Sequence, residues 1–510
     1  MSLAPKVIIV GAGPTGLALA ADLAGAGIPC RVLERRAQRS SWSRAFGITP
    51  YTMQLLDMRG VADTMAKHGL PWRHGPLGDG KSYLDFGMLD SRFPYMLIIP
   101  QNRTEDVLEE WARQSGADII RGAQVMGLEQ DAAGVTLQVE GPNGPWTERA
   151  SFVVGCDGVR SAVRSLAGVP FHGMSYDGSL ITADVHLKHP PNPPVHARTC
   201  GRGTVAVFPY GDGTFRLVVL DRKRLNVPVE QPVTLEEIQE SVTEILRMDL
   251  GIHEALWMSR FRSDQRQAER YRVGRVLLAG DAAHTHIPSG GQGLQVGIQD
   301  AINLGWKLKA ELEGWAPEGL LDSYEQERHP IAAATLRKTD LVYKYEISSA
   351  APLRFIRWLI MQTMKVKAFQ LPVVKELTGQ SLRYPPPRGA DAHAMVGRGI
   401  PDAHLEQGGE ASRVYELLRT RRFVLVDQTP EGLFAACAGS GWEGRLDVRQ
   451  GKLTNRKELP AALLIRPDGI VAWAPTRTGT HGLRAALRQW CGDPLTHDAE
   501  RTPPRVAARA

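Results

Sequence analysis

The chain of 510 residues is too long for one ordinary hydrophobic core, so its length predicts two or three domains. A composition of 43% hydrophobic and 23% charged residues is that of a globular protein and excludes the disordered and fibrous classes. The formal net charge of +6 comes from arginines scattered singly, which indicates mild attraction of anionic ligands and no nucleic-acid partner. The 5 cysteines are isolated and lack C-x-x-C spacing, so we expect no disulfide framework, no metal site and a cytoplasmic location. Only MSLAPK precedes the first predicted strand, so we expect no export signal.

Residues 7–34, VIIVGAGPTGLALAADLAGAGIPCRVLE, predict a strand, a tight turn, a helix and a second parallel strand. Gly11, Gly13 and Gly16 have the G-x-G-x-x-G spacing of a dinucleotide-binding turn. The first glycine permits the turn, the second leaves room for a pyrophosphate, and the third lets the helix pack closely on the strand. Glu34 ends the second strand, where its carboxylate can bind both hydroxyls of an adenosine ribose. An ordinary turn, a signal peptide or a membrane helix fits this stretch less well.

Between residues 36 and 155, helices and strands alternate. A polar loop that contains Arg44 leads to a helix near residues 52–58, and a strand at 95–100 precedes a helix for which Thr104 is the expected N-cap. A hairpin follows, with strands at 135–140 and 146–154. Its second strand is expected to run without a break into GCDGVRS.

From about residue 175 to 265, longer alternating strands predict an antiparallel sheet inserted into the first domain. Residues 275–280 return to the buried parallel type, and a helix is expected at 297–313. A proline-rich insert at 189–196 suggests a large, adjustable pocket rim. The predicted division is the first part of one domain at 1–174, the inserted sheet at 175–270, the second part with a helical segment at 271–384, and a C-terminal domain at 385–510.

Amphipathic helices are expected at 320–370. The apolar face of RFIRWLIMQTMKVKAF, residues 354–369, is expected to dock on the domain and not on a membrane, because the uncharged run is far too short to span one. The composition of PPPRG at 385–389 indicates a linker. Beyond it we expect a strand at 421–427, a hairpin at 461–473, a helix at 482–491 and an unstructured last dozen residues.

Two further motifs follow strand ends, namely Asp157 and Gly158 in GCDGVRSAVR and Gly280 and Asp281 in RVLLAGDAAHTHIPSGGQGLQ. An Asp there can hold a ribityl hydroxyl, and a glycine-rich turn before a helix can lie against an electron-rich ring edge. Together with the first fingerprint, these motifs resemble the FAD-dependent aromatic hydroxylases of the para-hydroxybenzoate hydroxylase type over residues 5–335. The C-terminal domain makes the chain look closest to bacterial aromatic-polyketide hydroxylases, in which that domain is thioredoxin-like; here it lacks C-x-x-C, so no redox role is expected.

The resemblance implies an α/β fold with a Rossmann-type FAD-binding domain. The residues that it assigns to FAD are Gly11, Gly13, Gly16, Glu34, Arg44, Gln101, Val125, Asp157, Gly158, Asp281, Pro288, Gly291, Gly293, Leu294 and Gln295. By position, the first acid binds the ribose, Arg44 and Gln101 bind the phosphate and ribityl region, and the Val125 backbone binds the adenine. Asp157 is implied to fix the segment that contacts both FAD and the nicotinamide nucleotide, and Asp281 to hold the ribityl chain.

The turn from Gly290 to Gln295 is implied to line the flavin ring, with Pro288 as a wall on the catalytic side and the Leu294 and Gln295 amides facing the pyrimidine oxygen. Many family members have Asn at the position of Gln295. A backbone role survives that change, whereas a side-chain role need not.

The resemblance further implies an enzyme in which NADPH or NADH reduces FAD. O₂, carried as a C4a-hydroperoxide of the flavin, then hydroxylates a phenolic substrate, for which a polycyclic polyketide is favoured. The chain has no second G-x-G-x-x-G, so the nicotinamide nucleotide is expected to bind transiently. Alternatives are a hydroxylase of simple phenols, an enzyme that inactivates an antibiotic, or a flavin-bound scaffold that NAD(P)H does not reduce. A halogenase is disfavoured because W-x-W-x-I-P is absent, and a homodimer is compatible with the family.

The side chains of Phe208, Pro209 and Tyr210 face either the substrate or the sheet core. His284 and His286 are spaced H-x-H without a third ligand nearby, which favours polar positions at a strand end over a metal site.

Two arginines at the start of a predicted helix have two possible roles. Arg160 and Arg164 are either solvated or in contact with phosphates of the nicotinamide nucleotide.

Overall fold

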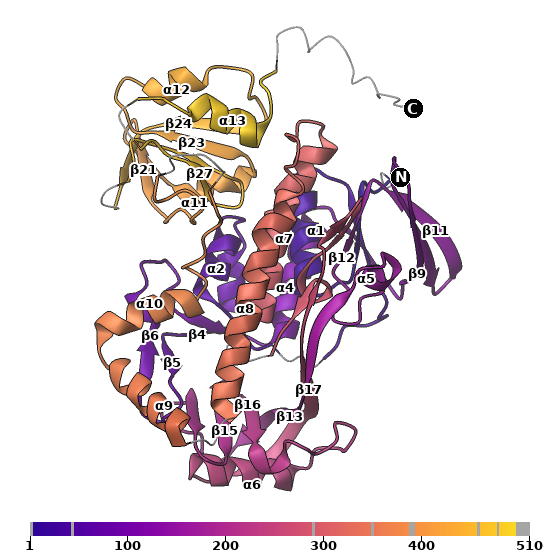
Figure 1. Cartoon of the computed structure of the whole chain (residues 1–510), viewed down its shortest axis with the longest axis vertical. Helices are drawn as coiled ribbons and strands as arrows, with labels where there is room; N and C mark the ends of the chain where they lie inside the picture. The colour runs from indigo at the N-terminus through magenta and orange to yellow at the C-terminus, as the bar shows by residue number, and fades with distance from the viewer. Residues whose placement is uncertain are drawn as a thin grey trace. The chain divides into compact units, whose positions relative to one another are not determined.

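The structure is a computed structural model, and it describes residues 4–41, 45–287, 291–347, 351–386, 393–455, 459–476 and 479–495. The chain divides into two compact units (Figure 1). The first unit comprises Met1–Asp57, Val61–Gly305 and Tyr324–Ser381, and the second comprises Met58–Gly60, Trp306–Ser323 and Leu382–Ala510. Most of the expected linker at 385–389 and the whole of the expected unstructured tail lie outside the described residues.

A largely parallel sheet carries the N-terminal fingerprint in the first unit. Its strand order is β18 (Arg272–Val273), β19 (Val276–Leu278), β12 (Phe152–Gly155), β1 (Val7–Val10), β2 (Cys30–Glu34) and β8 (Asp118–Arg121). All four residues of β1 are at most 6% exposed, as a β-branched run in a sheet covered on both faces should be. α1 (Pro14–Gly25) follows the turn after β1. The predicted strand, turn, helix and second strand at 7–34, and the parallel strand at 275–280, are confirmed.

Smaller elements surround this sheet. They are α2 (Pro50–Asp57), α3 (Ala62–Lys67), α4 (Gln101–Gln114), α5 (Ala162–Leu166), and the small sheets of β3 (Gly47–Ile48), β7 (Met96–Ile98) and β4 (Leu70–Trp72), of β5 (His74–Pro76) and β6 (Tyr83–Asp85), and of β9 (Gln124–Gln130), β10 (Val135–Gly141) and β11 (Gly144–Ala150). The helix expected near 52–58 and the hairpin from residue 135 are confirmed.

The prediction that Thr104 caps a helix is wrong. α4 begins at Gln101, with Pro100 in the N-cap position, and Thr104 is only 1% exposed inside the first turns. Pro100 has φ of −61° and ψ of 143°, the extended conformation that an N-cap residue adopts. The proline therefore sets the start of the helix, and the Thr104 hydroxyl donates to the Pro100 carbonyl instead.

The second hairpin strand does not run unbroken into GCDGVRS. β11 ends at Ala150 and pairs with β10, whereas β12 begins at Phe152 and pairs with β1. The N–H groups of Ser151 and Phe152 both donate to the Lys6 carbonyl, and the chain changes sheets at that point.

An antiparallel sheet forms the other large layer of the first unit. Its order is β14 (His196–Thr199), β15 (Gly203–Pro209), β16 (Thr214–Asp221), β13 (Phe171–Leu187), β17 (Ile252–Ala268) and β20 (His284–Thr285). α6 (Leu235–Leu246) covers one face and buries Val205 and Val207 against Ile238. Because side chains alternate along a strand, Phe208 and its cross-strand partner Arg216 point to the opposite face. The expected antiparallel strands and their Gly-Asp-Gly turn are confirmed.

Long helices follow the two large sheets. α7 (Gly293–Leu312) and α8 (Ser323–Ile347) precede α9 (Ala351–Thr363) and α10 (Lys367–Leu377). The expectation that the apolar face of 354–369 docks on the domain is wrong, because Phe355 and Trp358 are 62% and 54% exposed. In the described ranges, no helix combines the length and the apolarity needed to cross a bilayer.

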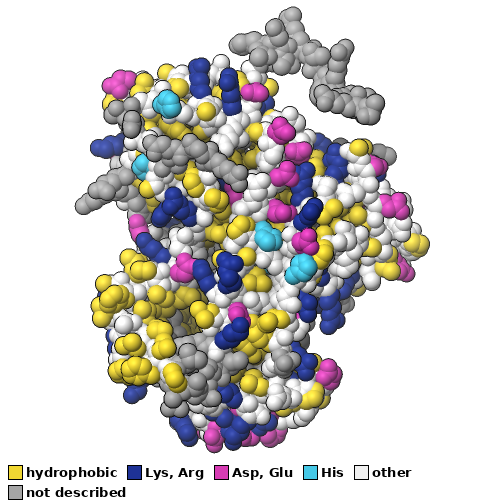
Figure 2. Space-filling view, in the orientation of Figure 1, with side chains coloured by type: hydrophobic (Ala, Val, Ile, Leu, Met, Phe, Trp, Pro, Cys, Tyr) yellow, Lys and Arg dark blue, Asp and Glu magenta, His cyan; other side chains and the backbone are white. Residues whose placement is uncertain are grey.

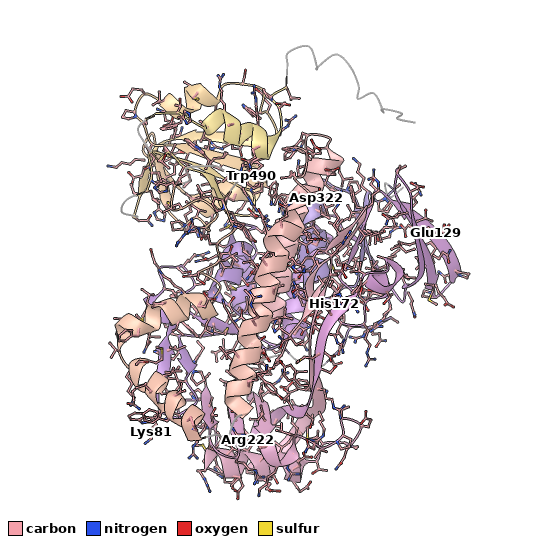
Figure 3. The ribbon with its side chains drawn as sticks, viewed as in Figure 1. Lys81, Glu129, His172, Arg222, Asp322 and Trp490 are labelled. Atoms are coloured by element: carbon pink, nitrogen blue, oxygen red, sulfur yellow. The ribbon has the colours of Figure 1, made fainter. Side chains whose placement is uncertain are left out.

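The second unit is built on a sheet with both strand directions. Its order is β24 (Leu446–Gln450), β23 (Phe423–Asp427), β26 (Ala462–Ile465) and β27 (Val471–Trp473), with β24 parallel to β23. A smaller sheet and further helices also belong to the unit, namely β21 (His404–Gln407), β22 (Glu410–Arg413), β25 (Lys452–Thr454), α11 (Val414–Leu417), α12 (Leu433–Ala438) and α13 (Leu483–Cys491). The core packs Phe434 and Leu487 with Trp306, and Trp490 on α13 borders it (Figure 3). The strand, hairpin and final helix predicted here are confirmed.

Candidate functional site

The glycine turn after β1 has the geometry that its spacing predicts. Gly11 has φ of +107°, and a Cβ there would lie 2.4 Å from the Cys156 carbonyl oxygen. A Cβ on Gly16 would lie 2.0 Å from the Gly11 oxygen, so α1 packs directly on the strand. A Cβ on Gly13, by contrast, would meet no atom of the described chain within 4 Å, and no side chain caps α1 there. The open side of Gly13 and the uncapped helix start therefore fit a pyrophosphate.

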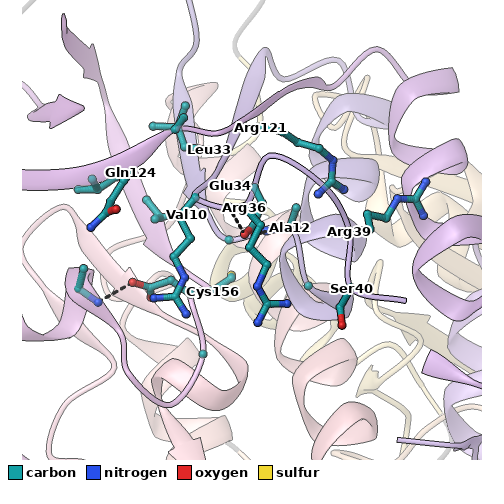
Figure 4. A pocket seen from close by; sticks show the side chains of 18 of the residues that line it. Val10, Ala12, Leu33, Glu34, Arg36, Arg39, Ser40, Arg121, Gln124 and Cys156 are labelled. Carbon is teal, nitrogen blue, oxygen red and sulfur yellow. Dashed lines mark hydrogen bonds between the residues drawn. The ribbon is translucent and has the colours of Figure 1, made fainter. Parts of the chain in front are cut away.

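A pocket lies where β1 and β2 end (Figure 4), and Glu34 belongs to its lining. The Glu34 Oε2 accepts the Ala12 N–H at 2.8 Å, and its Oε1 accepts the Arg36 N–H at 2.9 Å. These amides orient the carboxylate, whose remaining lone pairs can accept ribose hydroxyls. Arg39 and Arg121 line the same pocket, as does Val125, and both arginines form ion pairs with Glu109. An acid that suits a ribose therefore lies beside cations that already have a carboxylate partner.

The carboxylate of Asp157 accepts hydrogen bonds from residues of this chain. Its Oδ1 accepts the Ser161 hydroxyl at 2.5 Å, and its Oδ2 accepts the Ala162 and Val163 N–H groups at 2.7 and 3.2 Å. These bonds tie the strand end to the start of α5, and Gly158 continues the turn with φ of +82°. Both Asp157 and Gly158 line the pocket, so the geometry suits a residue that fixes the shape of this segment.

The turn at Gly280 and Asp281 rests on a residue that sequence reasoning missed. Asp300, on α7, accepts the Gly280 N–H at 3.0 Å, and its carboxylate lies 2.7 Å from both His284 Nε2 and Arg328 Nε. Burial alone would raise the pKa of Asp300, but Arg328 and His284 outweigh it and hold the pKa below the usual range. The charge network fixes the turn and leaves Asp281 exposed beside it, where the ribityl chain is predicted.

The start of α7 carries the turn predicted to line the flavin ring. Gly291 has φ of +64°, and Gly293 begins the helix, followed by the half-buried Leu294. The side chain of Gln295 is engaged inside the protein, because its Nε2 donates to the Gly47 carbonyl at 2.8 Å and its Oε1 accepts the Thr49 N–H at 3.1 Å. The side-chain amide of Gln295 therefore holds β3, and its backbone is the part that can contact a cofactor.

Gln101 is likewise partly engaged. Its Nε2 donates to Glu105 at 2.8 Å, and its Oε1 accepts the Ala45 N–H at 3.4 Å. Burial raises the pKa of Glu105, which faces the pocket with Glu34. Among the described residues, the Gln101 amide donates only to Glu105, so its second N–H can reach a ligand. Arg44, Pro288 and Gly290, which the resemblance also places at the flavin, lie outside the described residues.

The structure separates the three candidate substrate residues. Phe208 lies on the sheet face away from α6, and its ring centroid is 4.3 Å from that of Phe46. Pro209 is buried and points to the α6 side, as the alternation requires. Tyr210 shares the Phe208 face; its hydroxyl is shielded from solvent, and burial raises its pKa. Only Phe208 connects directly with the flavin-side segment, because Phe46 precedes the Gly47 that Gln295 holds.

The two arginines at the start of α5 behave differently. Arg160 is exposed and lines the pocket. Arg164 is 7% exposed; its guanidinium donates to the Ala282 carbonyl at 2.9 Å and to the Val159 carbonyl at 2.8 Å. Burial lowers the pKa of Arg164. Arg164 is therefore neither solvated nor available to bind a phosphate. In the sequence, the only signal for this structural role was the position of Arg164 within DGVRSAVR.

The two histidines have different partners within the chain. His284 serves the Asp300 network, and the His286 Nδ1 lies 2.8 Å from the Ile287 carbonyl oxygen. In the ranges described, no three His, Cys, Asp or Glu side chains gather in a way that could hold a metal ion.

Comparison with protein-family models identifies two matches along the chain. Residues 5–339 match the FAD binding domain family, and residues 393–494 match the aromatic-ring hydroxylase, C-terminal family. The chain belongs to the FAD-dependent aromatic-ring hydroxylases. The first match contains every predicted FAD position of this hydroxylase, and its mixed α/β fold is the fold of that family.

Known proteins similar to this hydroxylase cover almost its whole length. The solved structure of an anhydrotetracycline hydroxylase from Streptomyces rimosus is 38% identical and superposes with a TM-score of 0.85 over 97% of this chain and 100% of that chain. The rifampicin monooxygenase of Streptomyces venezuelae is 38% identical over 92% of this chain and 95% of its own. The dialkyldecalin synthase of Streptomyces rugosporus is 34% identical over 96% of this chain and 99% of its own.

Proposed function

We propose that this FAD-dependent monooxygenase uses NADPH or NADH to hydroxylate a phenolic, polycyclic polyketide. The contact of Phe208 with Phe46 carries the proposal, because it sets an aromatic side chain of the antiparallel sheet next to the segment that Gln295 holds at the start of α7. A flat aromatic substrate at that junction would lie between the sheet and the flavin turn. The names of the anhydrotetracycline and rifampicin relatives support a polycyclic substrate.

The residues of the chain bind and orient the cofactor in this proposal. The open side of Gly13 takes the pyrophosphate, Glu34 the adenosine ribose, the Val125 backbone the adenine and Asp281 the ribityl chain. When bound, FAD supplies electron transfer from the nicotinamide nucleotide and the activation of O₂. The remaining assigned positions, from Gly291 to the Gln295 backbone, would hold the ring near the N-terminus of α7, where the helix dipole favours negative charge.

The finer architecture is part of the same proposal. Residues 175–270 form the inserted substrate domain between the two parts of the FAD domain at 1–174 and 271–384, and α6 supports the sheet from behind. Residues 385–510 form a thioredoxin-like domain without C-x-x-C and without a redox role. We also propose that the enzyme is a cytoplasmic homodimer.

Anaerobic mixing of the yellow protein with NADPH tests the function. We expect bleaching of the flavin absorbance to be slow alone and to accelerate by about tenfold or more with a polycyclic phenol. Simple phenols serve as the matched panel. Rapid, coupled turnover of simple phenols with little response to polycyclic ones would overturn the substrate assignment.

A second candidate function is a flavin-bound scaffold that guides the reaction of a bound intermediate without reduction by NAD(P)H. The observation that favours it is the similarity to a dialkyldecalin synthase, whose name denotes no oxygenation. Absence of bleaching with NADPH and NADH for every ligand, with FAD fully bound, would support this candidate. Inactivation of an antibiotic, as the rifampicin monooxygenase relative suggests, would instead appear as ligand-dependent bleaching with that antibiotic.

A further inference from the structure

Helix α9 exposes large apolar residues, whereas the surface helix α6 buries its own. On α6, Ile238 and Val242 are 0% and 1% exposed against the antiparallel sheet. On α9, Phe355 and Trp358 are 62% and 54% exposed, and their rings stack on each other at 5.8 Å. Large apolar side chains of a surface helix that contact no core indicate a surface that something else covers.

The exposed residues extend from α9 onto α10. We call them the α9 patch; they are Phe355, Ile356, Trp358, Leu359, Ile360, Val366 and Phe369, each between 44% and 62% exposed. Figure 2 shows hydrophobic side chains gathered over α9 and α10. The α9 patch extends over both helices and is not a set of isolated surface residues.

The base of the α9 patch is anchored to the first unit. Met364, at the junction of α9 and α10, is buried with Leu84 and Phe86. Gln370 donates to the Met364 carbonyl at 2.6 Å and accepts the Asp85 N–H at 3.0 Å. These contacts hold the junction against β6 and leave the apolar residues of α9 clear of the core.

The segment that bears the patch is basic. Residues 351–377 contain 5 Lys or Arg and a single acid, Glu376. That acid forms an ion pair with Lys338, so it offsets little of the charge around the patch. A second copy of the chain docked by the same face would bring like charges together, whereas an anionic surface would be attracted.

We propose that the α9 patch docks the protein on the surface of an anionic lipid bilayer. Aromatic and aliphatic side chains on one part of a helix with Lys and Arg around them are the pattern of helices that lie in the plane of a membrane interface. The apolar side chains enter the boundary between headgroups and acyl chains, and Lys365 and Lys367 contact lipid phosphates. Neither helix needs to cross the bilayer. This inference concerns attachment and does not depend on the proposed reaction.

Vesicle sedimentation with the full chain loaded with FAD tests the proposal. We expect binding to phosphatidylglycerol vesicles at about 50 mM salt, at least about tenfold weaker binding to phosphatidylcholine, and loss of binding at high salt. Phe355→Asp with Trp358→Asp should lower the partition coefficient by at least about tenfold. Lys365→Gln with Lys367→Gln should lower it by about tenfold at low salt.

Leu433→Asp is the matched control, because Leu433 is an apolar residue 47% exposed on α12 of the other unit. It should bind vesicles like the unaltered protein, and all variants should retain FAD absorbance and far-ultraviolet circular dichroism. Failure to bind phosphatidylglycerol, or binding that the α9 substitutions leave unchanged, would overturn the proposal. A dimer that the Phe355→Asp and Trp358→Asp substitutions dissociate, without vesicle binding, would overturn it also and assign the patch to a second copy.

Discussion

Arg164 links two of the three motifs around the candidate flavin site, so its removal tests how the site is built. One arm of its guanidinium donates to the Ala282 carbonyl, next to Asp281, and the other donates to the Val159 carbonyl, next to Gly158. Its centre also lies 3.7 Å from the centroid of the Phe171 ring. In Arg164→Met, two charge-assisted hydrogen bonds worth about 1.5 kcal/mol each and a cation–π contact worth about 1 kcal/mol are lost. We therefore expect the free energy of unfolding to fall by about 4 kcal/mol.

Urea unfolding measures this loss, and quenching of FAD fluorescence on titration gives the Kd for the cofactor. We expect Arg164→Met to raise that Kd by about tenfold or more, because the two turns are no longer held together. Arg160→Met is the control for stability, since Arg160 is exposed four residues earlier and its loss should cost at most about 0.5 kcal/mol. Equal unfolding free energies for the two variants would refute the reasoning. A destabilised Arg164→Met protein with an unchanged Kd would limit Arg164 to a stabilising role.

Gly16→Ala should lower the melting temperature, because its Cβ would lie 2.0 Å from a backbone oxygen. Gly13→Ala should leave the melting temperature of the FAD-free protein unchanged and raise the Kd for FAD, because its Cβ would meet no atom of the described chain. A lower melting temperature for Gly13→Ala than for Gly16→Ala would contradict the turn geometry. The pKa of Asp300 is held below its unfolded value of about 3.9, so the stability it contributes is complete above about pH 5 and is lost as the pH falls through the lower folded value. Urea unfolding of Asp300→Asn should thus show a constant deficit at neutral pH that shrinks in acid, and a deficit independent of pH would contradict the network. Phe208→Ala should abolish acceleration of flavin reduction by a substrate while the FAD Kd stays unchanged, and acceleration equal to that of the unaltered protein would remove Phe208 from the substrate site.

Local patterns predicted much of the fold because the elements concerned are defined by near neighbours in sequence. The run Val7–Val10 with its three glycines fixes strand, turn and helix within about 20 residues. The hairpin from residue 135 carries its own alternation, and the hairpin near residue 461 consists of two short apolar runs on either side of a turn. The Thr104 error has the same local origin. A hydroxyl that suits an N-cap stood close to a proline whose conformation already starts the helix, and sequence pattern alone did not rank the two.

The parts of the candidate site that sequence reasoning missed depend on distant contacts. Asp300 and Arg328 are 28 residues apart and meet only because α7 and α8 pack together. Strand alternation divided Phe208 and Pro209 between two faces, but which face is covered depends on where α6 packs. The exposure of Phe355 was missed for the same reason, since an amphipathic pattern shows that a helix has an apolar face and not what lies against it.

Helix α7 has residues in both compact units. α7 begins at Gly293, in the turn assigned to the flavin, and from Trp306 onward it belongs to the C-terminal unit. There Trp306 is 2% exposed and its ring meets that of Phe423 edge-on at 5.4 Å. A chain ending near residue 385 would keep the whole of α7 but lose Phe423 and the core around Trp306. The indole of Trp306 would then be exposed on the helix that follows the turn assigned to the flavin. We therefore expect the core around Trp306 to stabilise the C-terminal end of α7 by packing, without cysteine chemistry.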